Sequence, residues 1–145
     1  MQAQGQQGTI QFSRLSPDSK WLAYTSTESG REELYITSFP GASGHWQISQ
    51  NGGTAPAWRG DSKELYFYEF SGGQTQIIAV DVAPQGDQFE TRNYRKLFAP
   101  GHLIAGGNAN FEVSRDGRRF LIPVQPEVAA APISLTLNWT GELGK

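Results

Sequence analysis

The chain of 145 residues contains no cysteine, and its single methionine is the first residue. Without cysteine there can be no disulfide, no thiol nucleophile and no zinc site built on cysteine ligands. No segment approaches the run of about 18 apolar residues that a membrane-spanning helix needs. The 12 Lys and Arg residues do not outnumber the 14 Asp and Glu residues, so the basic surplus that nucleic-acid phosphates demand is missing. We therefore expect neither a membrane nor a nucleic acid as a partner.

Glycine, proline and aromatic residues are plentiful instead. The 17 glycines and 8 prolines favour many turns over long helices, and the 12% of aromatic residues supply bulky apolar side chains. Residues 1–8 are rich in glutamine and glycine and lack the basic start and apolar centre of a signal peptide. We expect them to form a flexible N-terminal segment that does not direct export.

A short unit occurs three times along the chain. It reads Ser16-Pro17-Asp18-Ser19-Lys20, then Arg59-Gly60-Asp61-Ser62-Lys63, then Ser114-Arg115-Asp116-Gly117-Arg118, and an apolar run follows each copy. The aspartates of the copies are 43 and 55 residues apart. Periods of about 40 to 50 residues are typical of propellers and helical arrays. Because the copies consist of short β-rich runs between turns, with no sustained helical spacing, the pattern favours an all-β propeller.

Each copy divides into strands of one antiparallel sheet. The first is predicted to hold strands at 10–13, 21–26, 33–38 and 46–49, the second at 56–59, 64–69, 76–82 and 96–98, and the third at 111–114, 120–124 and 133–139. Residues 83–93 contain Pro84, Gly86 and Asp87 and are interpreted as an extended loop. The third unit ends after three strands, so its outer strand is missing. Trp21, Trp46, Trp58 and Trp139 are expected to pack between the sheets.

The repeats carry a family likeness. The turn unit, together with Gly44-His45-Trp46-Gln47-Ile48-Ser49 and Pro56-Ala57-Trp58-Arg59, resembles the blades of TolB-type (WD-like) β-propellers. The closing Asn138-Trp139-Thr140 resembles the end of the propellers that follow bacterial Ser/Thr protein kinase domains. The resemblance implies three blades, at 9–53, 54–107 and 108–145. It also implies a parent propeller in the periplasm or elsewhere outside the cytoplasm, whereas the chain itself indicates no compartment.

Propellers of this family usually have six or more blades. Three blades alone would leave apolar outer faces uncovered, so we expect a homodimer that closes one six-bladed ring about a two-fold axis. Aligning the first strands of the blades places Arg14 level with Glu112 across the junction of such a ring. The alignment therefore predicts an ion pair between the two subunits.

The residues that could carry chemistry are few. Asp18, Asp61 and Asp116 are expected to accept backbone N–H bonds within their own turns. His102 lies in the connection between the second and third blades, near the expected channel mouth. With Asn108, Asn110 and Thr54 it forms the predicted ligand-binding site.

Two functions fit this arrangement. The first is a self-assembling binding module that presents its channel mouth to a peptide or small-molecule ligand and needs no cofactor. The alternative is a metal-dependent hydrolase of esters or phosphoesters, in which His102 and Glu112 hold a divalent metal such as zinc. No zinc-site spacing supports the alternative, and the sequence does not decide whether the chain is an enzyme.

Overall fold

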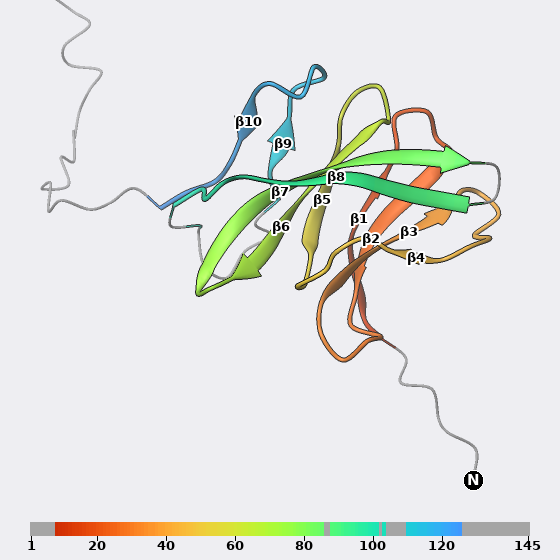
Figure 1. Ribbon diagram of the computed structural model, residues 1–145, viewed down its shortest axis with the longest axis horizontal. Helices are drawn as coiled ribbons and strands as arrows, with labels where there is room; N and C mark the ends of the chain where they lie inside the picture. Colours follow the sequence, from red (N-terminus) through yellow and green to blue (C-terminus); the bar gives the residue numbers. More distant parts are fainter. Residues whose placement is uncertain (1–7, 86–87, 102, 104–109, 126–145) are drawn as a thin grey trace, which may run out of the picture.

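A computed structural model describes residues 8–85, 88–101, 103 and 110–125 of the chain. This part is all-β, with ten strands in three antiparallel sheets and no helix among the described residues. Figure 1 shows two four-stranded sheets side by side and a short hairpin beyond the second of them. The predicted all-β class is confirmed. The predicted strand at 133–139, with Trp139, lies outside the described residues, as do residues 1–7 of the N-terminal segment.

The first sheet is a simple meander in the order β1-β2-β3-β4. Its strands are β1 (Ile10–Leu15), β2 (Trp21–Ser26), β3 (Glu33–Ser38) and β4 (Trp46–Gln47). Every residue of β2 has a partner on β3, from Trp21 opposite Ser38 to Ser26 opposite Glu33. A bulge between Gln11 and Arg14 interrupts the pairing of β1 with β2. Because a bulge strengthens the local twist, β1 can curve along the neighbouring sheet.

The second sheet follows the same order, β5-β6-β7-β8. Its strands are β5 (Thr54–Trp58), β6 (Glu64–Ser71), β7 (Gln74–Gln85) and β8 (Gln88–Phe98). The extended loop predicted at 83–93 is wrong, because β7 and β8 pair from Ile77 opposite Phe98 to Gln85 opposite Gln88, with two irregularities between Ile77 and Asp81. The hairpin extends because Phe89 is buried against the first sheet, with its ring centroid 5.0 Å from that of Trp21. That apolar contact outweighs the turn-forming tendency of the segment.

The third sheet is a two-stranded hairpin formed by β9 (Glu112–Val113) and β10 (Phe120–Leu121). Both strands are shorter than the predicted 111–114 and 120–124. Pro123 follows β10 and has no backbone N–H to donate to a ladder, which accounts for the early end of the strand. Beyond it, Val124 forms an isolated bridge with Leu103 in the connection that follows the second sheet.

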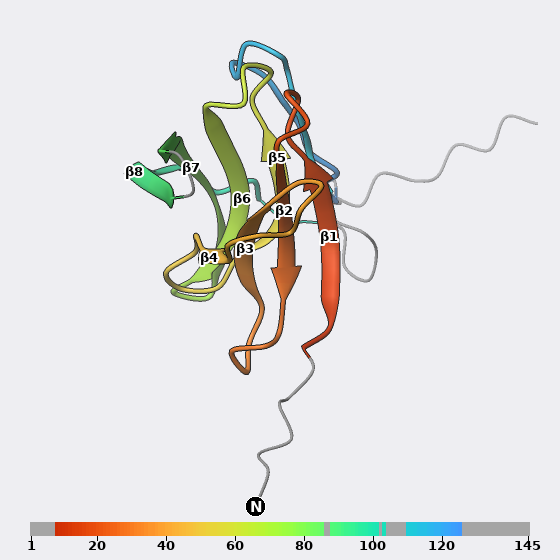
Figure 2. The same ribbon diagram turned by 90° about the vertical axis from the view of Figure 1, so that its right-hand side faces the viewer.

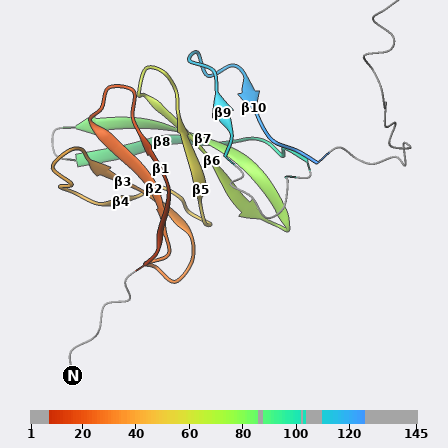
Figure 3. The same cartoon turned by 180° about the vertical axis from the view of Figure 1, so that it is seen from behind.

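The second sheet lies between the first sheet and the hairpin, as the view from behind shows (Figure 3). The side view places β1 and β8 at opposite sides of the molecule (Figure 2). One core cluster fills the space between the first and second sheets and is built around Trp21, Trp58 and Phe67, with Trp46 packed against it. A second cluster joins the opposite face of the second sheet to the hairpin through Tyr66, Tyr68, Phe111 and Phe120. The expected packing of Trp21, Trp46 and Trp58 between sheets is thus confirmed.

The remaining face of the first sheet is only partly covered. Alternation along β2 points Leu22 and Tyr24 away from the second sheet, whereas Trp21 and Ala23 point toward it. The Tyr24 ring stacks on that of Tyr35 at 5.9 Å, and His45 meets the Tyr35 ring edge-on at 4.6 Å. These aromatic side chains shield much of the face. Nearby, Ile10 remains 65% exposed.

Candidate functional site

The repeated aspartates hold the turns together. Asp18 Oδ1 accepts the Lys20 N–H at 3.2 Å, and Asp61 Oδ1 accepts the Lys63 N–H at 3.0 Å. In the third copy Asp116 Oδ1 accepts the Arg118 N–H at 3.1 Å. Each carboxylate therefore satisfies a backbone donor two residues further on, as the sequence predicted.

The candidate site is a cavity of about 330 Å³ beside the crossing from the first sheet to the second. Two consecutive glycines, Gly52 and Gly53, lie in the connection from the first sheet to the second. The Gly53 N–H donates a hydrogen bond to the Glu32 carbonyl at 3.1 Å. A side chain at position 53 would not fit, because an added Cβ would lie 2.6 Å from the Ser49 Cβ. The cavity is lined by Glu32, Gly52, Gly53, Thr54, Tyr68, Phe70, Thr75 and Leu103.

Thr54 is the predicted ligand-binding residue that reaches this cavity. It opens β5, opposite Tyr68 in the register, and its Oγ1 accepts a long hydrogen bond of 3.5 Å from Thr25 Oγ1. Asn110 is half-buried beside the second core cluster and is not part of the cavity lining among the described residues. The other two predicted members of the site, His102 and Asn108, lie outside the described residues.

Tyr68 contributes an unusual polar group. Its ring packs against that of Phe111 at 4.8 Å, and its Oη is buried with no hydrogen-bond partner in the described chain. Desolvation by this burial raises the pKa of the Tyr68 hydroxyl to about 12, so the group is neutral at physiological pH. A buried hydroxyl without a partner is uncommon in folded proteins and needs an explanation.

Glu32 is the only charged side chain that lines the cavity among the described residues. Its carboxylate is exposed and has no hydrogen bond or ion pair within the described chain. A second cavity of about 520 Å³ adjoins the first and shares Phe70, Thr75 and Leu103 with it. Sequence reasoning missed the roles of Glu32 and Tyr68. The only signal is the run Tyr66-Phe67-Tyr68: three consecutive aromatic residues predict a strand buried on both faces, and all three are buried in β6.

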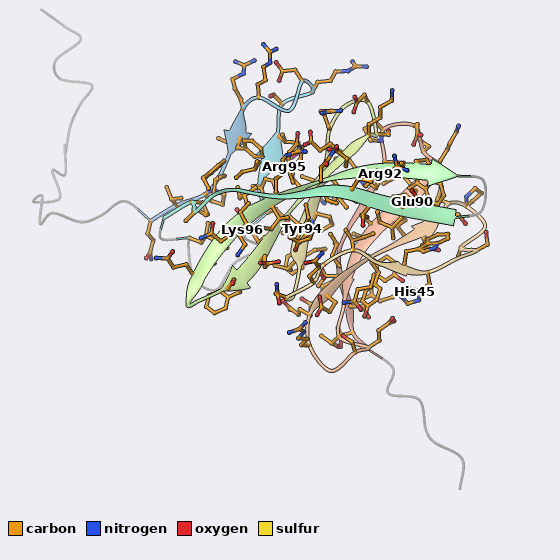
Figure 4. The ribbon with its side chains drawn as sticks, viewed as in Figure 1. His45, Glu90, Arg92, Tyr94, Arg95 and Lys96 are labelled. Carbon is orange, nitrogen blue, oxygen red and sulfur yellow. The ribbon has the colours of Figure 1, made fainter. Side chains whose placement is uncertain are left out.

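A separate set of paired side chains lies along the second sheet, around the two buried carboxylates Glu64 and Glu69. Glu64 accepts hydrogen bonds from Tyr66 Oη at 2.7 Å and Arg59 Nη1 at 2.6 Å, and from Arg95. The Tyr94 hydroxyl donates to the fully buried Glu69, and Lys96 Nζ lies 3.9 Å from the same carboxylate. Burial, and then the bond to Glu69, raise the pKa of Tyr94 well above its ordinary value. Figure 4 shows Tyr94, Arg95 and Lys96 following one another along β8.

Arg14 and Glu112 meet within one chain, with Arg14 Nη2 3.6 Å from Glu112 Oε1. The alignment of first strands had predicted this pair between two subunits. It forms internally because β1 packs beside β5 and β5 beside β9, which brings the two side chains within reach. A pair between subunits would require both side chains to exchange partners. The structure describes a single chain, so the predicted junction between two subunits stays a prediction.

Of the two residues predicted to hold a metal, the structure describes Glu112, whereas His102 lies outside the described residues. No group of three or more His, Cys, Asp or Glu side chains within the described ranges is placed to hold a metal ion. Glu112 is exposed and pairs with Arg14. The other histidine, His45, has its Nε2 2.8 Å from Glu28 Oε1, and both residues belong to the first four-stranded unit, far along the chain from Glu112.

In the part of the chain that the structure describes, no helix has the length and apolarity to cross a bilayer.

Comparison with known proteins identifies the architecture. No family model and no curated protein matches the sequence. Among solved structures, TolB from Acinetobacter baumannii superposes with a TM-score of 0.56 and 22% identity, covering 78% of this chain and 26% of that one. A putative TolB from Agrobacterium tumefaciens gives a TM-score of 0.54 and 17% identity, covering 82% and 44% of the two chains.

The chain therefore has a TolB-type β-propeller fold, as the sequence resemblance implied. It spans less than half the length of either structure. The likeness to kinase-linked propellers stays an expectation.

Proposed function

We propose that this chain is a propeller interaction module that pairs with a second copy of itself and binds a peptide or small-molecule ligand at the mouth of the resulting ring. In this proposal the sheets β1–β4 and β5–β8 and the hairpin β9–β10 are three blades. Two chains related by a two-fold axis supply six.

The observation that carries the proposal is a contact between successive turns. The Asp18 N–H in the first turn donates to Ser62 Oγ in the second at 3.0 Å. The Gly60 N–H in the second turn donates to the Arg115 carbonyl in the third at 3.1 Å. Each turn thus donates one backbone N–H hydrogen bond to the turn that follows it in the chain.

The series leaves one donor and one acceptor free at its ends. Asp116 is the equivalent of Asp18, and its N–H has no hydrogen-bond partner in the described chain. Ser19 is the equivalent of Ser62, and its Oγ is likewise unpaired. In a closed ring of two chains, the third turn of one subunit meets the first turn of the other. The Asp116 N–H would then donate to the partner's Ser19 Oγ, at both junctions by symmetry.

The faces beside these turns also support closure. On the hairpin, Val113 and Phe120 pack on the second sheet, so the alternate residue Leu121 faces away from it and is 75% exposed. On the first sheet, Ile10 and Leu22 line a shallow cavity of about 280 Å³ on the face turned away from the second sheet. Burying these apolar side chains against each other is favourable.

Sedimentation of matched variants tests the proposal. Ser19 and Ser62 both have a positive φ, of 60° and 61°, so Ser→Ala introduces the same backbone strain at each. Ser19→Ala removes one hydrogen bond of about 1 kcal/mol at each of two junctions, and the dimer dissociation constant should rise roughly 30-fold. Ser62→Ala removes the equivalent bond inside the chain, so it should lower the stability and leave the dissociation constant unchanged. A chain that sediments as a monomer, or equal effects of both variants on association, would contradict the proposal.

A further inference from the structure

We propose that the cavity beside Glu32, Thr54 and Tyr68 binds the ammonium group of a primary amine that carries an aliphatic chain. This assignment rests on the proposed ligand-binding mouth and names the chemical class of its ligand. Four features of the cavity lead to it: a single carboxylate without a partner in the described chain, the hydroxyl groups of Thr54 and Tyr68, an exposed aromatic ring, and an adjoining space whose described lining residues are uncharged.

The charge of the lining selects a cation. Glu32 supplies one negative charge, and the other lining residues among those described are uncharged. Because Glu32 has no partner in the described chain, a bound cation would not have to displace an existing ion pair. A carboxylate or phosphate ligand would meet this charge with no positive side chain to offset it, so the cavity disfavours anions.

The hydroxyl groups match the donors of an ammonium ion. An ammonium group presents three N–H donors and no acceptor. Glu32 can accept one of them, and the hydroxyls of Tyr68 and Thr54 have lone pairs for the others. The Tyr68 hydroxyl is buried without a partner, so a ligand donor would satisfy a group that the fold leaves unpaired. A cation close to the ring of Phe70, which is 69% exposed, gains further attraction from the face of that ring.

The adjoining cavity accounts for the aliphatic part of the ligand. It shares Phe70, Thr75 and Leu103 with the first cavity and extends to Ala99. No charged residue lines it among those described, so an uncharged chain can enter without separating ion pairs. An ammonium group at Glu32 and a carbon chain directed toward Ala99 would occupy both spaces together.

The test is a titration of the whole chain, followed by NMR, with three probes of similar size. These are n-butylammonium, the neutral n-butanol and the anionic butyrate. We expect n-butylammonium to bind at least tenfold more tightly than n-butanol, and butyrate to bind more weakly than both. Glu32→Gln should abolish the preference for the amine. The matched variant Glu90→Gln, at an exposed carboxylate on β8, should leave it intact.

Tyr68→Phe separates a role in binding from a role in folding. Because the hydroxyl has no partner within the described chain, the variant should keep the thermal midpoint and weaken n-butylammonium binding about three- to tenfold. Equal binding of all three probes, an unchanged preference in Glu32→Gln, or a lowered midpoint in Tyr68→Phe with binding intact would overturn the assignment. If n-butylammonium does not bind preferentially while the chain still sediments as a dimer, the assigned ligand class is wrong and the proposed self-assembly is unaffected.

Discussion

Replacing Phe89 by alanine tests the contact that joins the long hairpin to the first sheet. Phe89 is 8% exposed, and its ring centroid lies 5.0 Å from that of Trp21 and 5.9 Å from that of Trp46. A buried phenylalanine covers roughly 150 Å² of apolar surface, and at about 25 cal/mol per Å² this corresponds to about 4 kcal/mol. Phe→Ala substitutions in protein cores cost about 3–5 kcal/mol. We expect Phe89→Ala to lower the free energy of unfolding by about 3–4 kcal/mol.

Urea denaturation followed by tryptophan fluorescence measures this loss, with all variants at one protein concentration because association would add to stability. Phe70→Ala is the matched control, since Phe70 is 69% exposed and should cost less than about 1 kcal/mol. The reasoning fails if Phe89→Ala also costs less than about 1 kcal/mol. That result would mean that residues 83–93 do not pack on the first sheet.

Three further predictions concern charge and close packing. The hydrogen bond from Arg59 holds the pKa of Asp61 below its ordinary value of 3.8, so the stability it contributes is complete above that pH and lost as the pH falls below it. Asp61→Asn should lack this loss of stability at low pH, which acid unfolding curves measure. Identical curves for the variant and the unmodified chain would refute the role of the Arg59–Asp61 hydrogen bond. Burial raises the pKa of Tyr68 from 10.0 to about 12, so its contribution to stability is present below pH 10 and lost as the pH rises through 12. Tyr68→Phe should therefore flatten the loss of stability between these pH values, and an unchanged loss would contradict the burial. Gly53→Ala should cost about 1–3 kcal/mol, because the added Cβ would lie 2.6 Å from a neighbouring side-chain carbon, whereas Gly41→Ala has no atom closer than 4.0 Å and should be nearly neutral in thermal unfolding.

The local pattern of the sequence predicted most of the first sheet. The turn aspartates and the β-rich runs after them are short-range signals, and the strands at 21–26 and 33–38 agree with β2 and β3. The segment 83–93 shows where such signals fail. Pro84 and Gly86 indicate a loop locally, whereas the contact that extends the hairpin is with Trp21, far away in the sequence.

The candidate site was only partly predictable, for the same reason. Thr54 was predicted from its place at the start of the second blade, which precedes the blade that holds Asn108 and Asn110. Glu32 directly precedes β3 of the first sheet, whereas Tyr68 lies on β6 of the second. Both line one cavity because the glycine pair at 52–53 brings β5 close to the end of the first sheet. The alignment correctly placed Arg14 level with Glu112, since the two side chains form an ion pair. It could not distinguish a contact within one chain from one between two chains.

Sedimentation equilibrium of the unmodified chain over a hundredfold range of concentration tests the central claim most directly. Closure of a ring by two copies predicts a mass of twice the 15.9 kDa of one chain, with dissociation only on dilution. A mass of 15.9 kDa at every concentration would show that the three sheets are stable alone, and it would contradict the account.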